Sequence, residues 1–140
     1  MEEQWNVICY LAELFESNNI EYQFDASTSV FIHGVEFAMD DIDVVVLKKY
    51  KEKVKRLLSE YEQTNIEITN NLMEYFFVQI KNQKVHLMFP YSKTDCIDET
   101  RDISHNGVKI HTKTMEFYRR HIKEDNPLLP LIDSTPNRFV

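Results

Sequence analysis

The centre of the chain reads Asp40-Asp41-Ile42-Asp43-Val44-Val45-Val46. Its β-branched apolar residues predict a strand over 41–47, and that strand is expected in the middle of a sheet because apolar residues fall on both faces. Side chains alternate across a strand, so Asp41 and Asp43 should share one face, roughly 6–7 Å apart. Two carboxylates placed in this way can hold one divalent cation, and Mg²⁺ prefers such oxygen ligands. Taken alone, an Asp-x-Asp pair is more often a solvated strand end.

Periodicity on both sides of this stretch predicts the remaining elements. Helical spacing of apolar residues indicates helices over 3–18, 27–34 and 48–61, and a helix that Thr112 caps and that runs to about Ile122. Alternation indicates strands over 20–24, 65–69, 74–80, 84–89 and 107–111, with the third and fourth forming a hairpin. A further strand is expected near 101–104. This order predicts an α/β (α+β) domain in which helices flank a mixed β-sheet.

The domain is predicted to cover residues 1–125, followed by a Pro/Leu-rich tail over 126–140. We expect the tail to pack on the domain through its leucines and to be non-helical because of its three prolines. A homodimer or a contact with a partner protein is expected, with the leucine- and proline-rich tail as the candidate contact.

The composition excludes several classes of protein. The 140 residues are 43% apolar and 28% charged, which suits one folded domain rather than a disordered chain. The formal net charge of −7 argues against a protein that grips nucleic acid through many phosphates. No apolar run is long enough for a membrane span, and no signal peptide is apparent. Cys9 and Cys96 form no CxxC pair, so two free thiols in a cytoplasmic protein are expected.

The segment before the Asp-x-Asp strand adds a second motif. It reads Ala26-Ser27-Thr28-Ser29-Val30-Phe31-Ile32-His33-Gly34, and Asp41-Ile42-Asp43-Val44 follows after a loop. Together these stretches resemble the nucleotidyltransferase superfamily, which includes DNA polymerase beta and many small bacterial proteins. Bacterial members often read Gly-Gly-Thr-Ala-Leu-x-Leu-His-Gly, then a loop, then Asp-Ile-Asp-Leu. The resemblance covers roughly residues 5–122.

The resemblance implies a function for each part of the motif. Asp41 and Asp43 would be the catalytic residues and the ligands of Mg²⁺, with Mn²⁺ as the alternative ion. Ser27 and Thr28 would add hydroxyl donors to a turn whose backbone N–H groups bind the phosphates of an NTP. The reaction would transfer a nucleoside monophosphate to an acceptor, which is a small molecule, a protein or an RNA end, with release of pyrophosphate. His33 is expected to be a packed structural residue.

The chain departs from the family pattern at two positions. Ala26 stands where the first glycine is usual, and its methyl group disfavours a positive φ and close approach by a phosphate. His86 stands where a later strand normally carries the third carboxylate, and imidazole is a poor ligand for Mg²⁺. Asp25 and Asp40 are the nearby carboxylates that would compensate. We expect His86 to project into the same cleft as the two aspartates.

Three hypotheses follow from these observations. The first is a cytoplasmic nucleotidyltransferase with altered or weakened catalysis. The second is a catalytically degenerate member of the same fold that acts as a binding or regulatory module, such as an antitoxin or a phage-defence component. The third is an unrelated α+β domain. The third requires that Asp41 and Asp43 do not begin a central strand beside Ser27.

Overall fold

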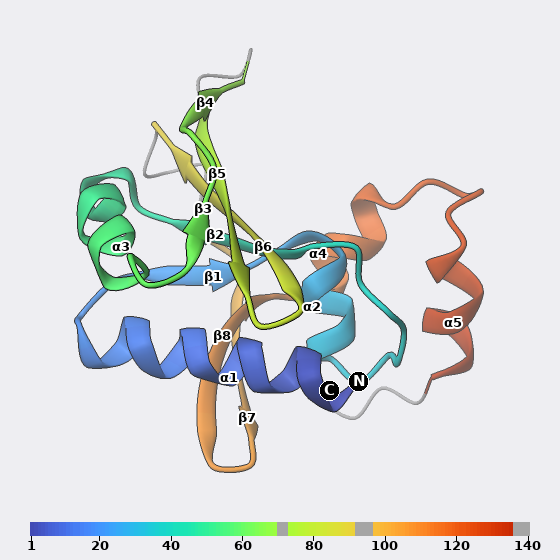
Figure 1. Ribbon diagram of the computed structural model, residues 1–140. Helices are drawn as coiled ribbons and strands as arrows, with labels where there is room; N and C mark the ends of the chain where they lie inside the picture. Colours follow the sequence, from blue (N-terminus) through green and yellow to red (C-terminus); the bar gives the residue numbers. More distant parts are fainter. Residues whose placement is uncertain (70–72, 92–96, 136–140) are drawn as a thin grey trace.

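The helices and strands are described here from a computed structural model, which describes residues 1–69, 73–91 and 97–135. The elements in chain order are α1 (Glu2–Ser17), β1 (Tyr22–Phe24), α2 (Ala26–Ile32), β2 (Ile42–Val46), the 3₁₀ turn η1 (Lys48–Tyr50), α3 (Lys51–Leu57), β3 (Glu62–Gln63), β4 (Glu67–Ile68), β5 (Met73–Ile80), β6 (Gln83–Pro90), β7 (Thr100–His105), β8 (Val108–Lys113), α4 (Met115–His121) and α5 (Leu128–Ser134) (Figure 1).

One mixed sheet organises the molecule. Its strands lie in the order β3-β5-β6-β2-β1-β8-β7, and β4 pairs with β5. The pairs β2–β6 and β1–β8 are parallel, whereas the other pairs are antiparallel. Helices flank this sheet, with α1 along one face (Figure 1). The predicted α/β (α+β) class with a mixed, helix-flanked sheet is confirmed, and β2 is central as the sequence predicts.

The main core lies between the sheet and α1. Ile8, Leu11 and Phe15 of α1 are fully buried against alternate strand residues such as Val44 and Leu87. Burying apolar surface stabilises the fold by roughly 25 cal/mol for each Å² removed from water. Because one set of alternating side chains faces this core, the other set, which includes Asp43, faces the opposite side of the sheet.

Two predicted helix boundaries are wrong. Thr112 lies in β8, and Thr114 caps the following helix by accepting a hydrogen bond from the Phe117 N–H at 3.1 Å. The helix predicted over 48–61 ends at Leu57. The side-chain amide of Gln63 donates to the carbonyls of Lys55 and Leu58 at this helix end, and the Leu58 carbonyl also accepts the Tyr61 N–H at 3.0 Å.

The prediction that the tail is non-helical is also wrong. Residues Leu128–Ser134 form α5, with Pro127 at the N-cap and Pro130 in the first turn. The backbone nitrogens of a first turn have no partner within the helix, so a proline there removes no intrahelical hydrogen bond. Ile132 of this helix is buried with Val30 and Val35. Residues 136–140 lie outside the described residues.

Two smaller features complete the fold. Gln23 is buried, because β1 lies between β2 and β8. Its side-chain amide donates to the Asp98 carbonyl and the Thr100 hydroxyl.

The thiol of Cys9 is free, and Cys96 lies outside the described residues. No helix in the described part of the chain has the length and apolarity needed to cross a membrane.

Candidate functional site

Two aspartates mark the N-terminal end of the central strand β2. Asp41 directly precedes the strand and Asp43 is its second residue, so both carboxylates lie on the face of the sheet opposite α1. Their side chains are partly exposed, at 31% for Asp41 and 16% for Asp43. A cleft of about 400 Å³ is lined by both aspartates together with Ser27 and Asp40. Asp41 and Asp43 therefore do begin a central strand beside Ser27, which contradicts the hypothesis of an unrelated α+β domain.

The turn before α2 is tied to β2 through backbone groups. The Asp25 N–H donates to the Asp43 carbonyl at 3.0 Å, and the Asp25 carboxylate accepts from the Ala26 N–H at 2.7 Å as the N-cap of α2. Burial raises the pKa of the Asp25 carboxyl, and the negative charge of Asp43 acts in the same direction. The bond from Ala26 and the charge of Lys113 oppose this rise.

Ala26 adopts the conformation that glycine would adopt. Its φ is +52°, in the left-handed region that L-residues disfavour by roughly 1–2 kcal/mol. The turn therefore keeps a glycine-like backbone although the chain carries a methyl group there. Alanine in place of the usual glycine therefore raises the energy of the turn while the turn keeps its shape.

The two predicted hydroxyl donors lie in different places. Ser27 lines the cleft, where its hydroxyl can reach a ligand. Thr28 is fully buried at 0% exposure, and its Oγ1 accepts the Asp43 backbone N–H at 2.8 Å. Thr28 thus fixes the strand that carries the carboxylates, and its assignment to nucleotide binding stays a prediction.

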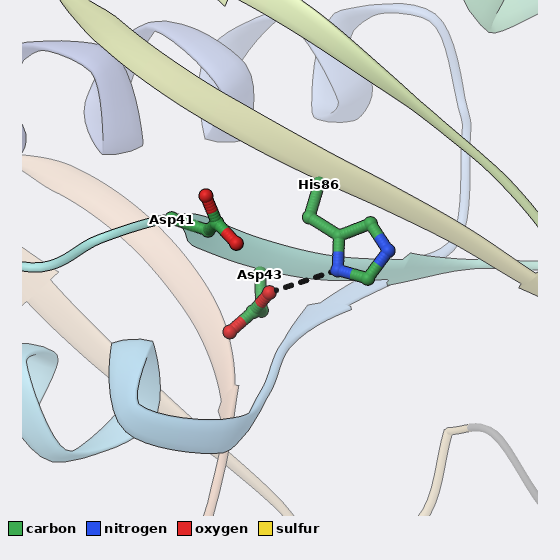
Figure 2. Close-up of side chains that lie close together, drawn as sticks. All are labelled: Asp41, Asp43 and His86. Atoms are coloured by element: carbon green, nitrogen blue, oxygen red, sulfur yellow. Dashed lines mark hydrogen bonds and ion pairs between the residues drawn. The ribbon is translucent and has the colours of Figure 1, made fainter. Parts of the chain in front are cut away.

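His86 faces Asp43 across the parallel pair β2–β6, where the two residues are in register. Its Nδ1 lies 3.1 Å from Asp43 Oδ1, and Figure 2 shows the imidazole pointing toward that carboxylate, with Asp41 beside it. One potential ligand atom from each of Asp41, Asp43 and His86 lies within 4.8 Å of the other two. His86 therefore lies beside the two aspartates but outside the lining of the cleft, so its projection into the cleft stays a prediction.

Aromatic rings fix the orientation of the His86 imidazole. Phe77 stacks on it with ring centroids 4.6 Å apart, and Tyr75 meets it edge-on at 5.1 Å. Its Nε2 is buried and has no hydrogen-bond partner within residues 1–69, 73–91 and 97–135. Lys84, two residues earlier on β6, places its ammonium 3.8 Å from Asp41 Oδ1 and over the Phe77 ring. The strand pattern alone did not reveal these neighbours.

The two carboxylates expected to compensate for His86 lie outside this three-residue group. Asp40 lines the cleft and is exposed, whereas Asp25 serves as the cap of α2. The cleft also has an apolar side that includes Phe37, Pro127 and Leu128. Pro127 and Leu128 come from the C-terminal segment, and no local sequence signal connects them to a site some 85 positions earlier.

His33 is packed inside the fold. Its Nδ1 lies 2.6 Å from the Ser29 carbonyl, four residues earlier, and burial lowers the pKa of its imidazole. It closes α2 as the C-cap and lies outside the lining of the cleft. These contacts agree with the structural role that the sequence predicts.

The three donors suit a divalent cation but differ from the set expected for Mg²⁺. Asp41 and Asp43 supply hard oxygen ligands, which Mg²⁺ accepts. His86 supplies a nitrogen and no negative charge, where the family resemblance implies a third carboxylate. Imidazole is a common ligand of Zn²⁺, Fe²⁺, Ni²⁺ and Cu²⁺ and a rare one of Mg²⁺.

Comparison with solved structures identifies the fold. A candidate nucleotidyltransferase of Thermotoga maritima superposes with a TM-score of 0.71 at 17% identity, over 86% of this chain and 83% of its own. The chain has the nucleotidyltransferase fold. The lincosamide antibiotic adenylyltransferase LnuA, solved with lincomycin bound, has this fold with a TM-score of 0.65 at 14% identity, over 96% of this chain and 97% of its own.

A third match extends over a smaller share of a longer protein with the nucleotidyltransferase fold. The antibiotic-resistance factor ANT(2'')-Ia gives a TM-score of 0.60 at 10% identity, over 84% of this chain and 69% of its own. No protein-family model matches the chain, and no curated protein sequence is similar to it.

Proposed function

We propose that the protein is a cytoplasmic nucleotidyltransferase that transfers a nucleoside monophosphate from an NTP to a hydroxyl-bearing acceptor. The observation that carries this proposal is the pair Asp41 and Asp43, which opens onto a cleft beside the first turn of α2. The cation expected from the family resemblance is Mg²⁺, with Mn²⁺ as the alternative.

Each residue has a defined part in the proposed reaction. Asp41 and Asp43 would hold the divalent cation, which when bound neutralises phosphate charge and orients the triphosphate. Ser27, at the rim of the cleft, would donate its hydroxyl to a phosphate oxygen. Thr28 and the Asp25 cap keep β2 and α2 at a fixed separation, so the carboxylates are positioned before the substrate arrives.

The proposed group transfer is a substitution at the α-phosphorus. The acceptor oxygen forms a bond to this phosphorus, and the bond to the oxygen that bridges toward the β-phosphorus breaks. Pyrophosphate leaves with that electron pair, and the acceptor's proton passes to solvent, which reaches the partly exposed carboxylates.

The acceptor is proposed to be a small molecule. A cleft of about 400 Å³ suits a ligand of that size, since such pockets commonly measure roughly 300–1,000 Å³. Two proteins of the same fold were solved with small molecules bound: LnuA with lincomycin, and ANT(2'')-Ia with adenylyl-2''-tobramycin. A protein or an RNA end stays the alternative.

The test is titration of each NTP into the protein by calorimetry, with and without Mg²⁺ or Mn²⁺. We expect cation-dependent binding of at least one NTP, weakened by roughly tenfold or more in Asp43→Asn because one of two charged ligands is lost. The control is His33→Ala, which should lower stability and leave the cation dependence of binding unchanged. NTP binding of equal strength with and without the cation would favour the hypothesis of a catalytically degenerate binding module.

Catalysis is tested separately by pyrophosphate release from the NTP that binds. Release should require the cation and increase when a library of small hydroxyl compounds is added. Cation-dependent binding without release for any compound, protein extract or RNA would leave the regulatory module as the better description.

A further inference from the structure

We propose that the group Asp41–Asp43–His86 selects a first-row transition ion, such as Mn²⁺, Co²⁺ or Zn²⁺, over Mg²⁺, and that His86 is the selecting ligand. This inference rests on the proposed function in that it concerns the cation of the same site. It replaces the expectation of Mg²⁺ with a different class of ion, for reasons that come from this chain's own residues.

The first reason is geometric. Metal–nitrogen and metal–oxygen bonds to such ions are about 2.0–2.2 Å long, so two ligands on opposite sides of one ion lie at most about 4.4 Å apart. The three donor atoms lie within 4.8 Å of one another, so a closure of a few tenths of an ångström assembles them around one ion. Register across β2–β6 holds Asp43 and His86 opposite each other, so this arrangement follows from the sheet rather than from flexible loops.

The second reason is the chemistry of the donors. Two carboxylates and one imidazole carry two negative charges, whereas three carboxylates would carry three. Mg²⁺ gains little from a nitrogen ligand and depends on the negative charge of its ligands. Exchanging a carboxylate for His86 therefore weakens the binding of Mg²⁺ more than the binding of transition ions. The transition ions bind imidazole well, and their affinities rise from Mn²⁺ through Co²⁺ toward Cu²⁺.

The third reason is the way in which the imidazole is held. The face of Phe77 and the edge of Tyr75 orient the ring so that Nδ1 points at Asp43. Metal-bound histidines usually gain their orientation from a hydrogen bond at the other ring nitrogen. Here Nε2 has no such partner among the described residues, and aromatic packing serves the same purpose.

Lys84 provides an internal control, because its ammonium cannot ligate a cation and changes the charge beside Asp41. Its ammonium lies 3.8 Å from Asp41 Oδ1 and competes with any cation there. Removing it in Lys84→Ala should raise the affinity for Mg²⁺ and for Mn²⁺ by similar factors. The ratio of the two affinities should therefore stay constant.

The test is calorimetric titration of Mg²⁺, Mn²⁺ and Co²⁺ into the nucleotide-free protein at about pH 8, where an ordinary histidine is neutral. In the parent protein we expect Co²⁺ to bind roughly a hundredfold more tightly than Mg²⁺, with Mn²⁺ between them. In His86→Asp the ratio of Co²⁺ to Mg²⁺ affinity should fall by roughly tenfold or more, mainly because Mg²⁺ binds better. An unchanged ratio in His86→Asp overturns the inference.

A second measurement on the parent protein does not depend on the folding of a variant. Long-range ¹H–¹⁵N spectra of the histidine rings, recorded as Zn²⁺ is added, should shift the Nδ1 signal of His86 and leave its Nε2 protonated. A His86 ring that is unaffected by Zn²⁺, while Asp41 and Asp43 respond, overturns the inference.

These outcomes are separate from failure of the proposed function. Selectivity is measured without nucleotide, so it can hold in a protein that binds no NTP. Conversely, cation-dependent NTP binding with equal selectivity in the parent and His86→Asp would support the transferase and reject His86 as a ligand.

Discussion

Ala26 lies at the start of the turn that precedes the two carboxylates, with φ of +52°. The turn requires a left-handed backbone at this residue, whereas alanine favours a negative φ. Asp43 is the contrasting case, because its N–H and its carbonyl are both engaged, by Thr28 and by Asp25. The site therefore combines a strained residue, Ala26, with a residue whose backbone is held on both sides, Asp43.

The variant Ala26→Gly is expected to be more stable than the parent. Relief of the left-handed strain gains roughly 1–2 kcal/mol, and the greater freedom of glycine in the unfolded chain removes roughly 0.5–1 of it. Urea denaturation should show a net gain of about 0.5–1 kcal/mol. The control Ala38→Gly lies in an exposed loop without a positive φ and should show none. A loss of stability in Ala26→Gly would contradict this interpretation.

At the scale of elements, the site depends on contacts that join one helix or strand to the next. The Thr28 hydroxyl joins α2 to β2, and Glu74 of β5 binds Lys51 of α3 at 2.7 Å and Lys48 of η1 at 3.4 Å. Both determine how rigidly the aspartate strand and the histidine hairpin are held.

Thr28→Val should weaken the site without changing any ligand. Valine keeps the shape of threonine but leaves the buried Asp43 N–H without an acceptor, at a cost of roughly 1–3 kcal/mol. We expect a lower midpoint in chemical denaturation and weaker Mn²⁺ binding, because Asp43 shifts. Thr28→Ser retains the oxygen and should keep both properties close to those of the parent; equal losses in the two variants would show that packing, not the hydrogen bond, matters.

Glu74 predicts a loss of stability in acid. The hydrogen bond from Lys51 is the chief cause that lowers the pKa of the Glu74 carboxyl below its ordinary value of 4.5, with Lys48 adding to it and burial opposing it. A carboxyl with a lowered folded pKa stabilises the fold fully above its unfolded pKa, and this contribution disappears as the pH falls through the folded pKa.

The measurement compares the parent with Glu74→Gln, which resembles the protonated acid. Denaturation at about pH 7 should show the parent to be the more stable, and the difference should shrink as the pH falls below 4.5 toward the lowered pKa of the folded state. A difference that does not depend on pH would mean that the ion pairs with Lys51 and Lys48 contribute nothing to stability.

At the scale of the whole molecule, the C-terminal segment completes both the fold and the cleft. Ile132 of α5 packs with Val30 of α2 and Val35, while Pro127 and Leu128 line the cleft beside the aspartates. Residues some 85 positions apart in the sequence therefore share one site. The division into a domain over 1–125 and a separate tail stays a prediction that these contacts do not test.

Ile132→Ala should reveal this connection. Truncating a buried isoleucine costs roughly 2–5 kcal/mol, and less where the surroundings can collapse into the cavity. We expect a loss of about 2 kcal/mol in urea denaturation together with weaker NTP binding, because the segment bearing Pro127 and Leu128 loosens. Leu131→Ala is the matched control, since Leu131 is exposed on the same helix. Equal effects of the two substitutions would argue against a role for α5 packing.

The parts of the fold that were predictable are those that local pattern determines. Strand β2 is rich in β-branched residues, and the alternation of β6 fixes the direction of His86, so both could be predicted from the sequence alone. Burial of Gln23 could not, because it depends on β8, which pairs with β1 from a distant part of the chain. The number of prolines in the tail does not predict helix α5, because Pro127 lies at its N-cap and Pro130 in its first turn, where no intrahelical hydrogen bond is lost.

The parallel pairing of β1 with β8 has a consequence for the synthesis of the protein. Phe24 is matched with Thr112, so one edge of β1 stays open until residues 108–113 have left the ribosome. Most of the chain has by then emerged, and an unpaired strand edge beside apolar surface is a template for association with other nascent chains. Pairing at such sequence separation is also slow to form. Production in cells should therefore gain soluble yield from lower temperature and from added chaperones, although the finished sheet has β1 paired on both sides.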